Sequence, residues 1–317
     1  MALLLLVAPA CAQPTALRTL PVPLAAENPP DRLGRLRFIG AVQFLAADPR
    51  VGGLSGMVVD DALNLTAVTD TGLWLTARIE IAADRLAGVS GLVMAPIQDG
   101  AGQPLPRGRM GDAESLARLP DGSLLVGFER WHRIRRFASP AAPGQFFPAP
   151  PGLENAPGNE ALETLTTLSD GRLLAIEEGR DDDTPRRAWL GGASGWMALS
   201  YQAAPGFRPT DAAGLPSGAP SAGGALVLER SFGPWRGFGA RIAYLSAADL
   251  AAATPGGTLR PAEVARLEPP LLVDNYEAIA VARRPQGGLY VFLASDDNFN
   301  ALQRTLLLAF VLEEALP

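Results

Sequence analysis

The chain alternates between short apolar runs and polar turns rich in Gly, Pro and Asp. Runs of four to eight apolar residues bounded by such turns are typical of buried strands. We find no convincing amphipathic helical period, so the pattern predicts an all-β protein. Residues 36–44 and 305–312 are the first and last long strands that it predicts.

Within this pattern one unit recurs: an acid, a strand, a turn, a second strand and a closing acid. A repeat of roughly 50 residues built from short strands is typical of a β-propeller, with one four-stranded blade for each unit. Five units are countable, and a sixth blade without the pattern stays open. We expect the strands at 305–312 and 36–44 to pair, which would close the ring and remove open sheet edges. The closing acids are Asp70, Glu129, Glu178, Glu229 and Asp296.

The composition agrees with this architecture. The 317 residues are 48% hydrophobic, and 34 Gly and 29 Pro suit many turns between short strands. We therefore predict one propeller domain over residues 36–317, preceded by a lead-in linker at 13–35.

The first 12 residues form an apolar run that is too short to span a bilayer and ends in the small residues Ala10 and Ala12. These features predict a signal peptide and a periplasmic or secreted protein. The basic residues that usually precede such a run are missing, which indicates a true start upstream of Met1. Lipid attachment at Cys11 is the alternative, although Ala8-Pro9-Ala10 is a poor lipidation motif.

The charged residues exclude some classes of partner. Net charge is −6, and all 27 basic residues are Arg, without a basic block. This argues against nucleic acid and against an anionic membrane surface as partners. No stretch is long enough for a transmembrane helix, and we expect a monomer that takes a small-molecule substrate.

The acids of the repeats predict a site. Counting outward from two-residue turns at Asp121-Gly122 and Asp170-Gly171 places Glu114 opposite Glu129, and Glu163 opposite Glu178. Facing carboxylates are unfavourable unless a cation lies between them or one is protonated. Equivalent positions of successive blades converge on the propeller axis, so we expect one ring of carboxylates at one mouth of the channel, made of Asp70, Glu114, Glu129, Glu163, Glu178, Glu229, Glu277 and Asp296.

Oxygen ligands at this density favour Ca²⁺, with Mg²⁺ as the alternative. We assign Glu114, Glu163 and Glu277 as catalytic candidates. Substrate oxyanions would be bound by Arg130, Arg230 and Arg304, with His132 nearby. For any single acid, capping a turn is the competing interpretation. The mature chain has no cysteine and one histidine, which excludes thiolate nucleophiles and His₃ or Cys-ligated zinc.

The repeat residues resemble the bacterial phytase-like ("esterase-like activity of phytase") domain proteins. The match runs over residues 35–313 and is most specific at Asp274-Asn275-Tyr276-Glu277 and at 295–299. The resemblance implies an exported β-propeller associated with phytase and esterase activities. The Asp-Asp-Pro-Ala motif of calcium-dependent propeller phytases is missing, which argues against phytate as substrate.

Three hypotheses follow. The first is an exported hydrolase of phosphate or related esters that uses a divalent cation in the carboxylate ring. The second is a non-catalytic envelope propeller that binds a ligand or a partner protein and carries a structural Ca²⁺. The third is a lactonase-type propeller.

Overall fold

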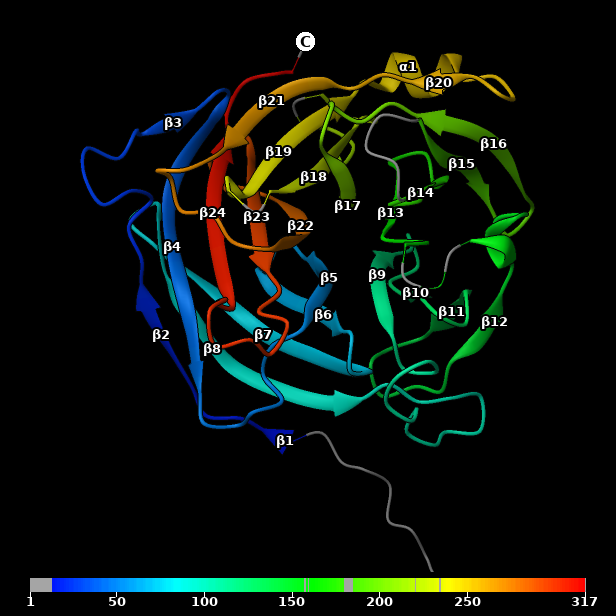
Figure 1. The fold of residues 1–317 in the computed structure, drawn as a ribbon, viewed down its shortest axis with the longest axis horizontal. Coiled ribbons are helices and arrows are strands. Elements are labelled where there is room, and N and C mark those ends of the chain that lie inside the picture. Colours follow the sequence, from blue (N-terminus) through cyan, green and yellow to red (C-terminus); the bar gives the residue numbers. More distant parts are fainter. Residues whose placement is uncertain are drawn as a thin grey trace, which may run out of the picture.

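The computed structural model describes residues 13–156, 158, 160–179, 185–219, 221–233 and 235–316. The predicted signal peptide at residues 1–12 lies outside these residues. Within them the chain forms five sheets arranged around a common axis, which is a five-bladed β-propeller (Figure 1). The prediction of a propeller is confirmed, and the blade number is five.

Each of the first three blades is an up-and-down sheet whose first strand lies innermost. Blade 1 contains β5 (Leu54–Val59), β6 (Asn64–Thr69), β7 (Leu73–Ala82) and β8 (Arg85–Pro96), with β1 (Gln13–Pro14) outside β8. Blade 2 contains β9 (Ala113–Arg118), β10 (Leu124–Phe128), β11 (Arg133–Phe137) and β12 (Gln145–Phe147), followed by the 3-10 helix η1 (Leu153–Asn155). Blade 3 contains β13 (Thr164–Thr167), β14 (Leu173–Ile176), β15 (Arg186–Gly192) and β16 (Gly195–Tyr201), with β20 (Thr258–Leu259) parallel to β16.

The last two blades use segments that are distant in sequence. Blade 4 contains β17 (Arg208–Gly214), β18 (Ala225–Gly233), β19 (Gly237–Leu245) and β21 (Ala262–Leu267), and α1 (Ala247–Ala252) precedes β20 on the way to β21. Blade 5 contains β22 (Tyr276–Arg283), β23 (Leu289–Ser295), β24 (Leu306–Leu312) and the N-terminal β4 (Leu36–Ala46), with β2 (Leu17–Pro21) and β3 (Arg32–Leu33) on β4.

The two ends of the propeller close the ring as the sequence predicts. β24 pairs antiparallel with β4, from Leu306 opposite Gln43 to Val311 opposite Arg37. Residues 13–35, which we expected to form a lead-in linker, contribute β1 and β2 to the outer edges of blades 1 and 5. These added strands cover edges that would otherwise expose unpaired backbone groups.

The apolar core is divided among the five blade interfaces. One cluster lies between each pair of neighbouring blades, for example Val68 and Trp74 of blade 1 against Leu116 and Phe128 of blade 2. Strands buried on both faces need apolar residues at every position. This explains runs such as β24, in which all seven residues are buried.

The innermost strands β5, β9, β13, β17 and β22 surround the axis and run in the same direction (Figure 1). Residues at the beginning of these strands therefore meet at one mouth of the central channel, and residues at their ends meet at the other. None of the helices in the described part of the chain is long and apolar enough to cross a membrane.

Candidate active site

One backbone contact recurs at the mouth where the inner strands begin. In four blades, the acid that follows the second strand donates its backbone N–H to a carbonyl just before or at the start of the inner strand. The distances are 2.9–3.0 Å, and the pairs are Asp70 with Gly53, Glu129 with Asp112, Glu178 with Ala161 and Asp296 with Asn275. The repeat thus holds four acids at equivalent positions around the axis.

A second set of residues comes from β-bulges at the start of the inner strands. The register shifts by one residue at Ser55 in β5, Glu114 in β9, Thr210 in β17 and Glu277 in β22. Glu163, just before β13, lies at the same kind of shift, since Thr164 pairs with Ile176 while Glu178 bonds to Ala161. A bulged residue leaves the ladder and can be turned toward a site.

The predicted pairing of Glu114 opposite Glu129 is wrong by two residues, since Glu129 lies opposite Asp112. Leu124 pairs with Arg118, and Leu119 donates its N–H to Ser123 at 2.8 Å, so three residues form the turn instead of two. Its last residue, Gly122, has φ +86°, which glycine adopts without strain. The bulge at Glu114 then shifts the register once more.

The predicted pairing of Glu163 opposite Glu178 is wrong for the same reason. Leu168 donates its N–H to Arg172 at 2.8 Å across another three-residue turn, in which Gly171 has φ +86°. The two registers shift by the same amount, so the blades keep their acids in equivalent places.

In blade 4 the prediction that Glu229 belongs to the carboxylate ring is wrong. The residue at the position of the four acids is Arg230, which pairs with Arg208 at the start of β17. Glu229, one residue earlier, lies on the opposite face of the strand. It is fully buried there, where it accepts hydrogen bonds from the Tyr201 hydroxyl at 2.6 Å and from Arg241 at 2.7 Å. Glu229 is therefore part of an ion pair inside the fold and not of the carboxylate ring.

Three carboxylates of blade 2 lie close enough to bind one metal ion. Asp112, Glu114 and Glu129 each offer an oxygen within 4.8 Å of the others. Asp112 and Glu114 share a hydrogen bond, and Glu129 shares another with Glu163. Burial, followed by the charges of Glu129 and Asp112, raises the pKa of Glu114 well above its usual value. Burial also raises the pKa of Glu129 to about 7, although the N–H of Ala161 bonds to its carboxylate at 2.6 Å.

Blades 1 and 5 add two acids to this group. Burial, together with the charges of Asp112 and Asp297, raises the pKa of Asp70 to about 6. The buried Oδ1 of Asp70 has no hydrogen-bond partner among the described residues. Burial raises the pKa of Asp296 to about 8, against the hydrogen bond that Asn298 N–H donates to its Oδ1 at 2.7 Å.

Two glycines of blade 1 make room for these acids. A Cβ on Gly53, whose φ is +64°, would lie 2.2 Å from Asp70 Oδ1. A Cβ on Gly52 would lie 2.5 Å from Asp297 Oδ1, and this oxygen accepts the N–H of Gly53 at 3.2 Å. Only glycine allows the chain to approach the carboxylates this closely.

Arg230 is the counter-charge on the far side of the ring. Its guanidinium bonds to Glu178 at 2.9 Å and to Glu277 and Asn275. Burial lowers the pKa of Arg230, but the charges of Glu277, Glu178 and Glu163 outweigh this and raise it overall. Burial raises the pKa of Glu277 to about 7 even though Arg230 opposes the shift. Burial and the charges of Glu114 and Glu129 raise the pKa of Glu163 well above its usual value.

The other predicted substrate-binding residues lie around this group. Arg130 forms an ion pair with Asp112, with 2.6 Å between Nε and Oδ2, and its side chain is 47% exposed. Arg304 bonds to Asp274 at 3.2 Å. The ring of His132 contacts the carbonyl of Ala156 at 3.2 Å through Nε2, and its Nδ1 is buried without a partner in the described part of the chain. Arg130 thus contacts an acid of the site, Arg304 pairs with Asp274 just before β22, and His132 contacts a loop.

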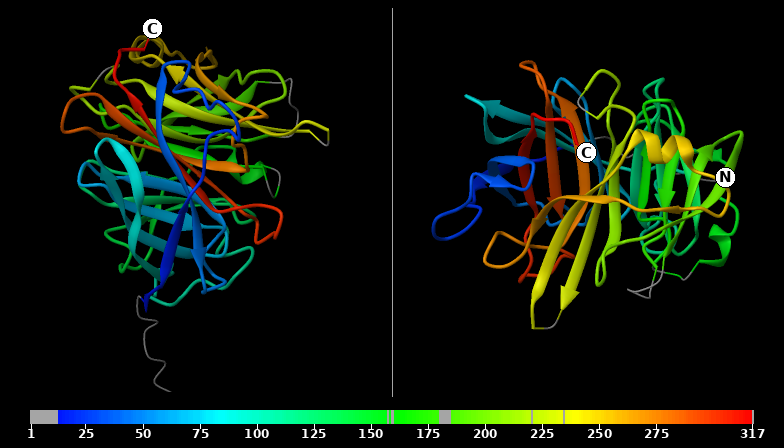
Figure 2. Two further views of the ribbon diagram at one scale, coloured as in Figure 1. Left: turned by 90° about the vertical axis from the view of Figure 1, so that its left-hand side faces the viewer. Right: turned by 90° about the horizontal axis from the view of Figure 1, so that it is seen from above.

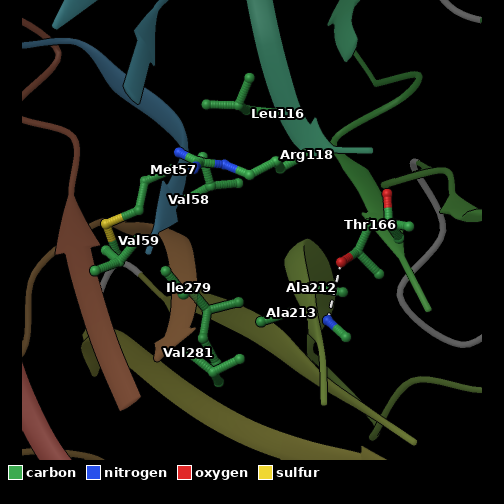
Figure 3. A pocket seen from close by; sticks show the side chains of 13 residues that line it. Met57, Val58, Val59, Leu116, Arg118, Thr166, Ala212, Ala213, Ile279 and Val281 are labelled. Atoms are coloured by element: carbon green, nitrogen blue, oxygen red, sulfur yellow. Dashed lines mark hydrogen bonds between the residues drawn. The ribbon is translucent and has the colours of Figure 1, made fainter. Parts of the chain in front are cut away.

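The other end of the channel has a different character. A cavity of about 120 Å³ lies there, lined by the later residues of all five inner strands. Figure 3 shows its largely aliphatic side chains, including Met57, Val59 and Ile279, beside Arg118 and Thr166. The acids, which we call the acid mouth (Asp70, Asp112, Glu114, Glu129, Glu163, Glu178, Glu277 and Asp296), are therefore confined to the end where the inner strands begin.

The sequence analysis missed two members of the site. Asp112 opens the second repeat, two residues before Glu114. From the sequence alone nothing indicates that Asp112 lies at the site, because it is the bulge at Glu114 that places it opposite Glu129. Asn275 bonds to Arg230 and precedes Glu277 in the same way. The sequence signal that could have found both residues is their shared spacing, two positions before Glu114 and Glu277.

The donor set fits a hard divalent cation. All side chains of the acid mouth offer oxygen, and Asp70 Oδ1 and Glu277 Oε2 are buried without a partner among the described residues. Burial, followed by the charges of neighbouring acids, raises the pKa of Asp70, Glu114 and Glu163. Carboxylate oxygens in such a group are ligands for Ca²⁺ or Mg²⁺. Asp112, Glu114 and Glu129 are the members of this set whose oxygens lie close enough together to hold one ion.

Comparison with known proteins gives the following results. No curated protein matches the chain. Among solved structures, a gluconolactonase from Xanthomonas campestris is 12% identical, with 95% of this chain and 100% of the other covered and a TM-score of 0.44. A family AA12 carbohydrate-active enzyme of Trichoderma reesei is 11% identical (97% and 99% covered, TM-score 0.45). A virginiamycin B lyase from Staphylococcus aureus is 9% identical (92% and 99% covered, TM-score 0.44). Similarity this low carries no information about the chemistry of the chain.

The family comparison is more direct. The sequence model of the Phytase-like family, described as "Esterase-like activity of phytase", matches residues 49–299. This range contains the whole acid mouth, Arg130 and Arg230. The chain therefore belongs to the Phytase-like family.

Proposed function

We propose that this protein hydrolyses phosphate esters or related esters at the acid mouth, with one divalent cation bound by Asp112, Glu114 and Glu129. The observation that carries the proposal is the approach of these three carboxylates to within 4.8 Å of one another in a group with little counter-charge. A divalent cation bound there would polarise an ester oxygen and lower the pKa of a water molecule.

The acids around the cation site have pKa values suited to proton transfer. General acids and bases work best when their pKa lies near the working pH. The pKa of Glu277 is about 7, and its Oε2 lacks a partner among the described residues. We propose Glu277 as the group that accepts a proton from water. Glu163, which shares a hydrogen bond with Glu129, would hold a proton and orient Glu129 toward the cation.

Arginine side chains at the rim would bind the negative charge of the substrate. Arg130 is half-exposed and already contacts Asp112, so its remaining N–H groups can reach a phosphate or carboxylate next to the cation site. Arg304, which pairs with Asp274 and is partly exposed, is a second candidate for this role. Arg230 is engaged by Glu178 and Glu277, so we assign it chiefly to holding these acids in place.

Chelation tests this proposal. We expect the purified protein to hydrolyse some members of a panel of 4-nitrophenyl phosphates, 4-nitrophenyl esters and lactones, to lose activity in EDTA and to regain it with Ca²⁺ or Mg²⁺. Glu129→Gln should be inactive, whereas Asp121→Asn, on an exposed turn far along the blade, should keep full activity. Activity that survives chelation, or that no metal elicits, would contradict the proposal. Calcium binding without any turnover would instead support a non-catalytic propeller.

We also propose export to the periplasm or the medium, because the apolar run at residues 1–12 ends in a small-residue cleavage pattern. The test is the N-terminal sequence of the protein recovered from each cell fraction. A mature chain that begins at Gln13 outside the cytoplasm is expected, and a cytoplasmic chain that keeps Met1 would contradict it.

A further inference from the structure

A cavity of about 400 Å³ lies beside the acid mouth. Blade 4 contributes Arg208, Arg230, Phe232 and Phe238 to its lining, and the segments before and after β22–β23 contribute Asn275 and Asn298. Arg230 and Asn275 belong to both the cavity and the hydrogen bonds of the acid mouth. A molecule in this cavity would therefore lie next to the proposed reacting centre.

One wall of the cavity is aromatic and comes from the β18–β19 hairpin. β18 and β19 continue beyond the inner part of blade 4, and Figure 2 shows this yellow hairpin projecting from the body of the propeller. Phe232 and Phe238 face each other across the two strands, with ring centroids 4.9 Å apart and an interplanar angle of 47°. Phe232 is 66% exposed, so its ring does not belong to the core.

The rest of the lining is polar, and Arg208 gives it one positive charge. Asn275, Asn298 and Gln303 are neutral amides, and the charge of Arg230 is offset by Glu178 and Glu277. The neighbouring acids are negative, and a polyanion would be repelled by them unless several cations were bound. An apolar ring with a single reacting group fits this lining better, since pockets of this size are mostly apolar with a few polar groups that fix orientation.

We propose that this cavity binds the aromatic part of the substrate, so that the enzyme prefers aryl esters, and aryl phosphate monoesters in particular, over alkyl and polyphosphorylated ones. The ring of the substrate would stack on Phe232 and Phe238, and its ester group would lie toward Asn275 and the cation site. Aromatic pairs at these distances attract each other beyond the burial of area alone. This inference rests on the proposed function for the reaction, but the binding of the ring can be measured without turnover.

The test compares two phosphonates that are not hydrolysed and differ in the ring. Calorimetric titration of the full chain in Ca²⁺ should give about tenfold tighter binding for phenylphosphonate than for methylphosphonate. Phe232→Ala should reduce this ratio to less than about twofold, and Phe232→Leu should leave an intermediate value. Phe146→Ala is the matched control, because Phe146 is 76% exposed on β12 and does not line the cavity, and it should keep the full ratio.

Equal affinity for the two phosphonates, no binding of either, or an unchanged ratio in Phe232→Ala would overturn the inference. The melting temperatures of all three variants should remain close to that of the parent, because both side chains are exposed. Selective binding of phenylphosphonate without hydrolysis of any ester would uphold the cavity and contradict the proposed function. Hydrolysis with equal KM for phenyl and methyl phosphate would support the proposed function and contradict the binding of the ring in the cavity.

Discussion

Glu229 and Arg230 are consecutive residues of β18, and their side chains lie on opposite faces of blade 4. Arg230 reaches the axis and bonds to Glu178 and Glu277, whereas Glu229 is buried between Tyr201 and Arg241. Adjacent residues of a strand point to opposite sides of the sheet, so a shift of one residue decides which of them enters the site. Four blades place an acid at this position and the remaining blade places the arginine that partly neutralises them.

This arrangement predicts that Glu229 stabilises the fold and does not bind metal. Glu229→Gln leaves Arg241 without its buried partner, and breaking such a pair typically costs about 3–5 kcal/mol. We expect a loss of about 3 kcal/mol in the free energy of unfolding, measured by urea denaturation, with Ca²⁺ affinity unchanged. Glu129→Gln is the matched variant on the ring face, and it should weaken Ca²⁺ binding at least tenfold. A large loss of Ca²⁺ affinity in Glu229→Gln would contradict this prediction and show that Glu229 acts with the carboxylate ring.

Arg230 should stabilise the metal-free protein as the counter-charge of the ring. Arg230→Met removes the charge that lies between Glu178 and Glu277, and we expect the metal-free protein to lose about 3–5 kcal/mol of stability because two buried carboxylates lose their partner. Adding Glu277→Gln should restore part of this loss, since the remaining negative charge is then smaller. Urea denaturation of the single and double variants in EDTA measures both effects. A single variant as stable as the parent would show that Arg230 is not the counter-charge of the ring.

The same residues show how far the sequence predicts this protein. The blades could be found because their strands are buried on both faces and therefore appear as continuous apolar runs, as in β24. The exact register of the strand pairs could not be found. An Asp-Gly pair occurs in two-residue and in three-residue turns, and the pairing of the two strands differs by one residue between these turns. The bulge at Glu114 adds a further shift that leaves no mark in the sequence. Blade 4 has no Asp-Gly turn from which the strand pairing could be counted. From the sequence, Glu229 is therefore assigned to the ring, in place of Arg230, only because it is an acid like the residues at this position in the other blades.

Glu114 gives the most direct test of the cation site. Glu114→Gln removes one ligand oxygen charge, so Ca²⁺ affinity measured by calorimetry should fall at least tenfold. In EDTA at pH 8 the same variant should be more stable than the parent, because the pKa of Glu114 is raised by burial and by its acidic neighbours, and its ionised form is unfavourable in the fold. Asp121→Asn, at an exposed turn, should change neither quantity. A variant that binds Ca²⁺ as tightly as the parent would exclude Glu114 as a ligand.

The acid mouth also predicts how stability depends on pH. Burial is the main cause of the raised pKa values, which are about 6 for Asp70, about 7 for Glu129 and Glu277 and about 8 for Asp296. In the unfolded chain these carboxyls have pKa values near 4. Between pH 4 and pH 8 the folded chain therefore holds protons that the unfolded chain releases. The free energy of unfolding should fall as pH rises through this range, by up to about 1.4 kcal/mol per pH unit for each such proton.

A bound cation should reverse this trend, because it takes the place of the protons. We expect the melting temperature in EDTA to fall from pH 5 to pH 8, and the increase caused by Ca²⁺ to be small at pH 5 and large at pH 8. Differential scanning calorimetry at each pH, with EDTA or with Ca²⁺, measures both. Glu229→Gln serves as the control, since it should lower all melting temperatures and leave the calcium-induced increase intact. A melting temperature in EDTA that rises with pH, or a calcium effect that is the same at pH 5 and pH 8, would show that the acids of the mouth do not share a cation.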